Sequence, residues 1–242
     1  MIIGALLLLF VLLTLLAVRM ARRIQNPPRE LEPFRRLPRQ IGQALETGQP
    51  PHLALGSGGL IGNEAALTLS GGRILERLAQ DSAVGEVFPF VTVADPVALL
   101  YARHVLQDAC HRQGVLASLP PDRVWWAGAS PMAYAAGLTL LLGTQPVATS
   151  IMSGLFREEA VLAGEIGQRY GAHLIFAMPE PGGAAALWPF DPNLAVGEEA
   201  FAAFPQGEIP GRPSALLLAH DLIRWLLIAF LAIVALGFAL RG

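Results

Sequence analysis

The sequence contains no lysine, and all seventeen of its basic residues are arginine. This absence excludes a P-loop lysine, a Schiff-base lysine and any other catalytic lysine. Cysteine is almost absent too: Cys110 is the only one, so no intrachain disulfide can form. Such sparse use of cysteine is typical of a protein in a reducing compartment.

Charged residues are also scarce, at 15% of the 242 residues, against about 25% in typical soluble domains. Two terminal stretches account for the surplus of apolar residues. Residues 1–18 carry no charge and, as a helix, would span roughly 27 Å, close to the hydrocarbon thickness of about 30 Å. Residues 225–240 are free of charge as well. We therefore expect transmembrane helices at residues 1–20 and 215–240.

The charges beside the first stretch predict its orientation. A secretory signal peptide begins with basic residues, whereas here Arg19, Arg22 and Arg23 follow the apolar run, which favours a retained anchor. Seven arginines lie between positions 19 and 39, and the positive-inside rule places them in the cytoplasm. We expect a protein of the bacterial cell membrane with a cytoplasmic domain and both termini outside. Its expected partners include the lipid bilayer and no nucleic acid.

Residues 21–51 are rich in arginine and proline, and we expect them to form a juxtamembrane tether. Prolines at this density interrupt regular structure, so only residues 41–45 are expected to form a short helical turn. The arginines have two interpretations. They either lie along anionic headgroups or only set the topology of the chain.

From position 52 the pattern changes to apolar strands that alternate with helices. The predicted strands are residues 53–55, 87–94, 124–128, 147–152, 173–178 and 194–196. Apolar strands in alternation with helices predict a parallel sheet that is covered on both faces. The predicted fold class is therefore α/β: a Rossmann-like three-layer domain with a mostly parallel sheet, flanked by N- and C-terminal transmembrane helices. The domain is expected over residues 52–208, followed by a linker at 209–214.

The ends of these strands form the candidate site, because ligands of open α/β sheets bind beyond the carboxyl ends of the strands. The residues there are small, polar or acidic, and backbone N–H groups at the first turn suit an anion. The tentative ligand-binding residues are Gly56, Ser57, Gly58, Gly59, Asp95, Ser130, Ser153 and Gly154.

The glycine spacing limits this interpretation. Gly56, Gly58 and Gly62 give GxGxxxG, and the dinucleotide fingerprint GxGxxG would need a glycine where Ile61 stands. The alternative is that these glycines allow a tight turn and close packing of a helix on a strand. We expect no cofactor.

Asp95 and Ser130 have a structural alternative, because each comes directly before a proline that begins a helical pattern and each is a good N-cap. No GxSxG motif is present, so no catalytic residue is assigned and enzymatic activity stays open. His104, Asp108 and His111 have a helical spacing that suits a metal. The apolar face of that helix lies elsewhere, so we expect this trio in solvent and no metal site.

Five segments of the chain carry a resemblance to a known family. They are LALGSGGL, FVTVADP, SPMAYAAG, SIMSGLFREEAVL and VGEEAFAA, which together span residues 53–203. In this combination they resemble a family of bacterial membrane-anchored proteins of unknown function with a similar α/β domain. The resemblance implies a membrane location, and it assigns no catalytic residue.

Two functions from different classes follow from these observations. The first is a non-catalytic scaffold or assembly subunit of a homo-oligomer or a larger membrane complex. The second is a domain that senses or converts a small nucleotide-like or anionic ligand at the glycine-rich strand ends. The absence of a complete catalytic constellation in the sequence favours the scaffold.

Overall fold

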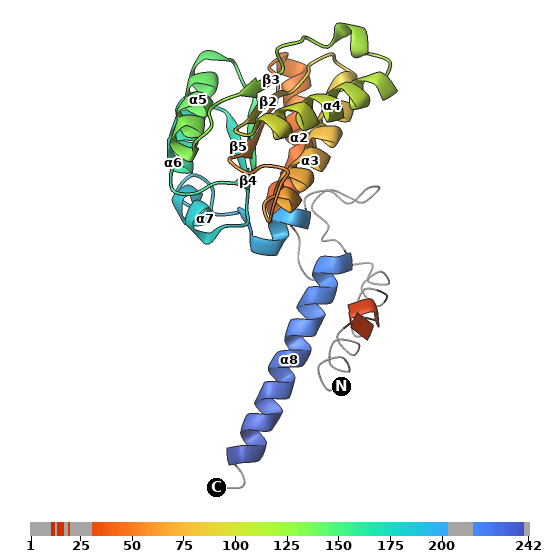
Figure 1. Ribbon diagram of the computed structural model, residues 1–242, viewed down its shortest axis with the longest axis vertical. Coiled ribbons are helices and arrows are strands. Elements are labelled where there is room, and N and C mark those ends of the chain that lie inside the picture. The colour runs from red at the N-terminus through yellow and green to blue at the C-terminus, as the bar shows by residue number, and fades with distance from the viewer. Residues whose placement is uncertain (1–10, 13, 17–18, 20–30, 203–214, 240–242) are drawn as a thin grey trace. The chain divides into compact units, whose positions relative to one another are not determined.

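A computed structural model describes the chain except for residues 1–10, 13, 17–18, 20–30, 203–214 and 240–242 (Figure 1). The chain divides into two units, residues 31–211 and the two terminal segments taken together. The first unit is an α/β domain, which confirms the predicted class.

The domain is built on six parallel strands in the order β3-β2-β1-β4-β5-β6. The strands are β1 His52–Gly56, β2 Phe90–Val93, β3 Val124–Trp126, β4 Thr149–Leu155, β5 His173–Met178 and β6 Ala195–Val196. Every residue of the three central strands is buried. Strands covered on both faces carry apolar runs without alternation, which is why the sequence shows them so clearly.

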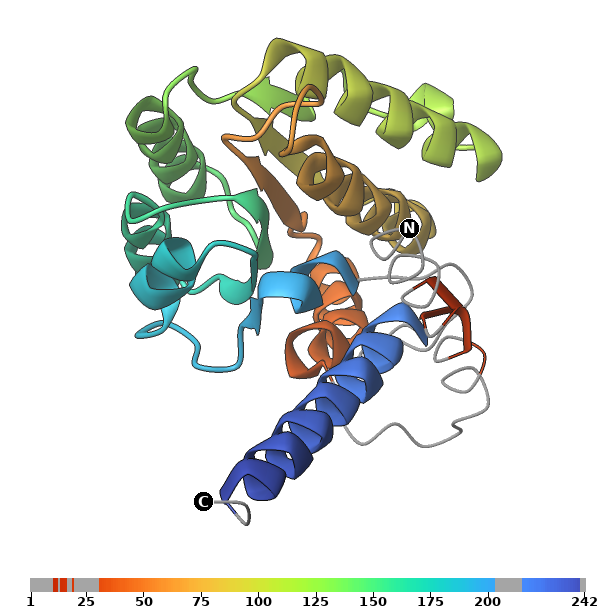
Figure 2. The ribbon, with the colours of Figure 1, turned by 60° about the horizontal axis from the view of Figure 1, so that its bottom comes forward.

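Helices cover both faces of the sheet, as Figures 1 and 2 show. One face carries α2 Glu32–Thr47, α3 Ala65–Ala83 and α4 Pro96–Arg112, and the other carries α5 Pro131–Thr144, α6 Ala160–Arg169 and α7 Pro181–Leu187. Two short 3-10 helices complete the domain, η1 Leu116–Ser118 and η2 Gly197–Ala202. The result is the predicted three-layer arrangement, with the strand order of the Rossmann fold.

Helix α2 departs from the sequence prediction, because residues 32–47 were expected within an irregular tether. Pro33 stands at the start of the helix, where its missing N–H removes no hydrogen bond. Pro38 lies inside the helix and costs a backbone bond there. Burial of Phe34, Leu37 and Ile41 against the domain offsets that cost. The rest of the predicted tether before Leu31 lies outside the described residues.

The predicted transmembrane helices receive no support from the structure. Most of residues 1–20 and the linker at 209–214 lie outside the described residues. Residues 215–239 do form a helix, α8 Ala215–Ala239. Across the part of the chain that the structure describes, however, no helix has the length and apolar character needed to cross a membrane.

Candidate functional site at the carboxyl edge of the sheet

The strand order places the topological switch point between β1 and β4. In this strand order the connections from β1 and from β4 leave the sheet in opposite directions, and ligands of such folds bind in the crevice between the two strand ends. The predicted residues Gly56, Ser57, Ser153 and Gly154 all lie at this point. The structure therefore brings together the first and fourth strand ends, as the sequence-based site required.

Direct backbone packing closes this switch point. Gly56 has φ +74°, and a Cβ atom there would overlap the backbone of Leu155. In the same way, a Cβ atom on Gly154 would overlap the carbonyl of Leu55. The register shifts between Ala54 and Gly56, so β4 bulges at this point. These glycines therefore permit two backbones to touch, which is the structural alternative considered from the sequence.

Hydrogen bonds also hold the loop that follows β1 against the end of β4 and against α3. The carbonyl oxygen of Leu155 accepts from the Ser57 N–H at 2.9 Å and from the Ser57 hydroxyl at 3.1 Å. The Thr68 hydroxyl donates to the carbonyl oxygen of Gly59 at 2.9 Å and so ties the loop to α3. A Cβ atom on Gly58 would lie 3.4 Å from the Leu155 side chain, so this glycine is packed as well.

The remaining predicted residues serve mainly as caps or sheet residues. Asp95 accepts from the Ala98 N–H at 2.8 Å and so caps α4, while its carboxyl carbon lies 3.3 Å from a Cβ built on Gly59. Ser130 accepts from the Ala133 N–H at 3.3 Å and caps α5. Ser153 is buried within β4. Both capping interpretations are confirmed, and Asp95 is the residue that the fold brings beside the glycine loop.

A buried polar network lies beneath this edge, and no motif in the sequence indicated it. His52 on β1 is fully buried, with Nδ1 2.9 Å from the Ser150 hydroxyl on β4 and Nε2 3.1 Å from the Thr92 hydroxyl on β2. The Thr92 hydroxyl is 2.9 Å from the hydroxyl of Tyr134 on α5. That phenol accepts from the Gly56 N–H at 3.2 Å and donates to the Thr92 carbonyl at the same distance.

Burial keeps the histidine of this network neutral. Burial lowers the pKa of His52 from 6.5 to about 3, and it also raises the pKa of the Tyr134 phenol. A neutral imidazole donates from one nitrogen and accepts at the other, which matches the two hydroxyl partners. At neutral pH the network therefore holds three strands and a helix together without carrying charge.

The described residues hold no group of three side chains able to bind a metal. In the trio suggested by spacing, Asp108 forms an ion pair with Arg112 at 3.0 Å, and His104 and His111 are exposed. The trio therefore lies in solvent, as expected.

These features define a Rossmann-like α/β domain whose switch point is closed by its own backbone. The chain belongs to the DUF6754 family, a domain of unknown function whose model matches residues 1–240. No curated protein and no solved structure matches the chain.

Proposed function

We propose that the protein is a non-catalytic assembly subunit that docks through the carboxyl edge of its sheet. The observation that carries this proposal is a set of large apolar side chains exposed at that edge. We call this set the apolar rim; its members are Ile61, Val97, Leu100, Trp126 and Met132. Ile61 is 84% exposed and Met132 is 62% exposed. Clusters of this kind on a folded protein mark interaction surfaces.

The rim gathers residues from several connections at one edge. Ile61 lies in the loop between β1 and α3, and Val97 and Leu100 lie at the start of α4. Trp126 ends β3, and Met132 lies in the first turn of α5. The carboxyl ends of parallel strands share one edge of the sheet, so these segments are neighbours.

Trp126 shows that this exposure is maintained by the fold. Trp126 is 53% exposed, yet its indole N–H donates to the Ala94 carbonyl oxygen at 2.8 Å. The bond holds the ring in place before any partner arrives. A rigid aromatic anchor loses little conformational entropy on binding, which is why such residues dominate interface energetics.

The polar groups of the same edge support docking over catalysis. Asp95 and Ser130 cap helices, and the Ser57 hydroxyl is bonded to a backbone carbonyl. These side chains already form hydrogen bonds within the domain. We therefore expect a partner to contact this edge mainly through the exposed apolar side chains. The proposed partner is a second copy of this chain. In a twofold dimer the same surface of each copy forms the interface, and two apolar surfaces can pack on each other.

Replacing Ile61 and Met132 by serine together is expected to disrupt this assembly. Loss of two exposed apolar side chains removes contact area without disturbing the buried core. The full chain, purified in detergent, is expected to form an oligomer, and the Ile61→Ser/Met132→Ser variant is expected to have a protein mass closer to that of one chain. Light scattering corrected for bound detergent measures that mass.

Val84→Ser is the matched control for this experiment. Val84 is 86% exposed, like Ile61, but follows α3 at the opposite edge of the sheet. This variant is expected to keep the wild-type mass. A wild-type chain of monomeric mass, or a rim variant that assembles as fully as the control, would rule out docking of a second copy through the rim.

The proposed setting is a membrane, with the α/β domain in the cytoplasm and both termini outside. Support comes from the uncharged terminal stretches and from the seven arginines between positions 19 and 39. An alkaline phosphatase fused after Gly242 is expected to be active in bacterial cells, because that reporter works only outside the cytoplasm. Activity of a cytoplasmic reporter at the same position would contradict this orientation.

A second candidate function is the binding of a nucleotide-like or anionic small ligand at the same edge. The strand order favours it, because ligands of this fold bind at the β1–β4 switch point. The Asp95 carboxylate, which a Cβ atom on Gly59 would meet, supplies one polar group beside the loop. This function requires a nucleoside or sugar phosphate to slow amide hydrogen exchange in the loop at 57–64.

A further inference from the structure

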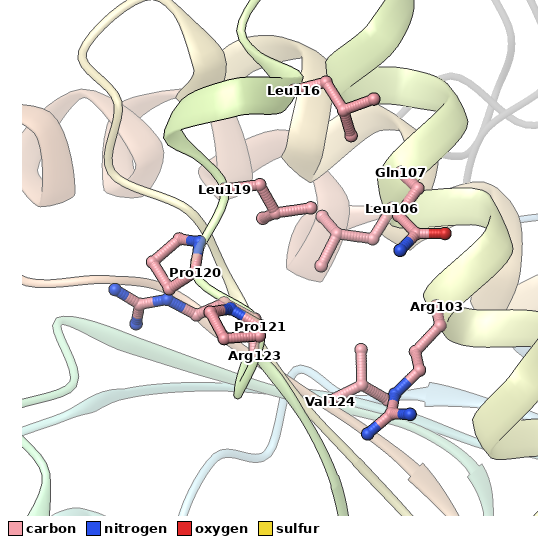
Figure 3. Close-up of a pocket in the computed structure, with 9 residues that line it drawn as sticks. All are labelled: Arg103, Leu106, Gln107, Leu116, Leu119, Pro120, Pro121, Arg123 and Val124. Carbon is pink, nitrogen blue, oxygen red and sulfur yellow. The ribbon is translucent and has the colours of Figure 1, made fainter.

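A cavity of about 300 Å³ lies at the opposite edge of the sheet, away from the apolar rim. It is open to solvent on one side and is bordered by the second half of α4, by η1 and by the segment that leads into β3 (Figure 3). This volume is at the lower end of the range for small-molecule sites, about 300–1,000 Å³. The cavity uses none of the residues of the carboxyl edge.

The centre of the cavity is apolar. Leu106 and Val124 are buried and form its base, and Leu116 and Leu119 project toward them from η1 and the residue after it (Figure 3). Pro120 and Pro121 complete the wall. Leu116 is exposed, although its neighbours in the cavity are apolar. The cavity therefore accommodates a compact apolar body.

The border of the cavity carries two guanidinium groups. Arg103 extends from α4 beside Val124, and Arg123 lies on the other side of Pro121 (Figure 3). Among the described residues, neither has a carboxylate within ion-pair distance. Arg112, on the same helix as Arg103, instead pairs with Glu76 at 2.6 Å and with Asp108 at 3.0 Å. Arg103 therefore leaves its positive charge available, whereas Arg123 also interacts with the charge of the neighbouring Asp122.

Arg123 is held differently from Arg103, because it packs on an aromatic ring. Its guanidinium lies 4.3 Å from the centre of the Phe90 ring, and partial burial lowers its pKa. Its Nε is buried and has no hydrogen-bond partner within the described structure. Because this Nε is inaccessible even to water, a ligand in the cavity does not reach it. Arg103 is therefore the guanidinium that is left to meet an anion at the cavity border.

We propose that this cavity binds a small organic carboxylate whose apolar body fills the space between Leu106, Leu116 and Leu119. The carboxylate would face Arg103, since guanidinium and carboxylate form paired, charge-assisted hydrogen bonds. The Gln107 side chain, which also borders the cavity, provides a further amide donor. This site is independent of the docking function, because the two lie at different edges of the sheet.

Three small probes test the proposal on the full-length protein by isothermal titration calorimetry. Phenylacetate has both the charge and the apolar body, phenylacetamide lacks the charge, and acetate lacks the apolar body. Phenylacetate is expected to bind at least tenfold more tightly than either of the others. No binding of phenylacetate, or equal binding of phenylacetamide, would overturn the proposal.

Two variants locate the binding. Arg103→Gln removes the charge at an exposed position and is expected to weaken phenylacetate binding at least tenfold. Leu116→Trp is expected to fill the cavity and abolish binding. Arg112→Gln is the control on the same helix and is expected to bind as the wild type does. If Arg103→Gln and Leu116→Trp both retain wild-type affinity, phenylacetate binds elsewhere and the site is wrong.

Discussion

Gly56→Ala is expected to lower the free energy of unfolding by at least about 3 kcal/mol, a large share of the roughly 5–15 kcal/mol that stabilises a typical domain. The added methyl group would meet the backbone of Leu155, which is held in β4 and cannot move aside as a flexible side chain does. The backbone at Gly56 also has φ +74°, a conformation that costs other residues about 1–2 kcal/mol. Urea unfolding of the full chain, followed by tryptophan fluorescence, measures the loss.

Gly62→Ala separates these two contributions. Gly62 has φ +88°, but nothing lies within 4 Å of a Cβ built there. Its substitution is expected to cost only the conformational term, about 1–2 kcal/mol. If the two variants lose equal stability, the close contact between β1 and β4 is not the reason why position 56 needs a glycine. That result would contradict the description of the switch point as closed by backbone packing.

Acidification is expected to destabilise the domain through His52. The pKa of this buried imidazole is about 3 in the folded chain and 6.5 in the unfolded chain. Between these values the unfolded chain binds the extra proton, so stability is full above pH 6.5 and falls as the pH drops. The gap between 6.5 and 3 corresponds to about 5 kcal/mol in total.

His52→Gln isolates this contribution, because an amide can donate and accept but does not titrate. The variant is expected to be less stable than the wild type at about pH 7, since its more flexible side chain serves the Thr92 and Ser150 hydroxyls less well than the rigid imidazole does. The difference in unfolding free energy is expected to shrink by several kcal/mol toward about pH 4. A difference that stays constant with pH would mean that His52 does not remain neutral in the fold.

Much of the fold was predictable because its central strands are buried on both faces. Apolar runs such as residues 90–93 follow directly from that burial, and the helices between them follow from caps such as Asp95 and Ser130. Helix α2 was not predictable from this proline-rich stretch, because prolines at such density usually interrupt a helix. Pro33 occupies a position where proline is favourable, and the packing of Phe34 and Leu37 compensates for the second proline.

The candidate site was predictable only in part. The sequence indicates that Gly56 and Gly154 follow strands, but their mutual contact depends on which strands are neighbours. The network around His52 was missed for the same reason. Its partners Thr92 and Ser150 lie 40 and 98 residues away in the chain, and only the strand register brings their side chains together.

Hydrogen exchange on the full-length protein tests the docking function most directly. Amide exchange in peptides that cover residues 57–64 and 126–132 is expected to slow as protein concentration rises, because assembly buries the apolar rim. The peptide that contains Val84, at the opposite edge, is expected to exchange at the same rate throughout. The docking function would be contradicted if amide exchange in the peptides at 57–64 and 126–132 did not depend on protein concentration and slowed instead on addition of a nucleoside or sugar phosphate.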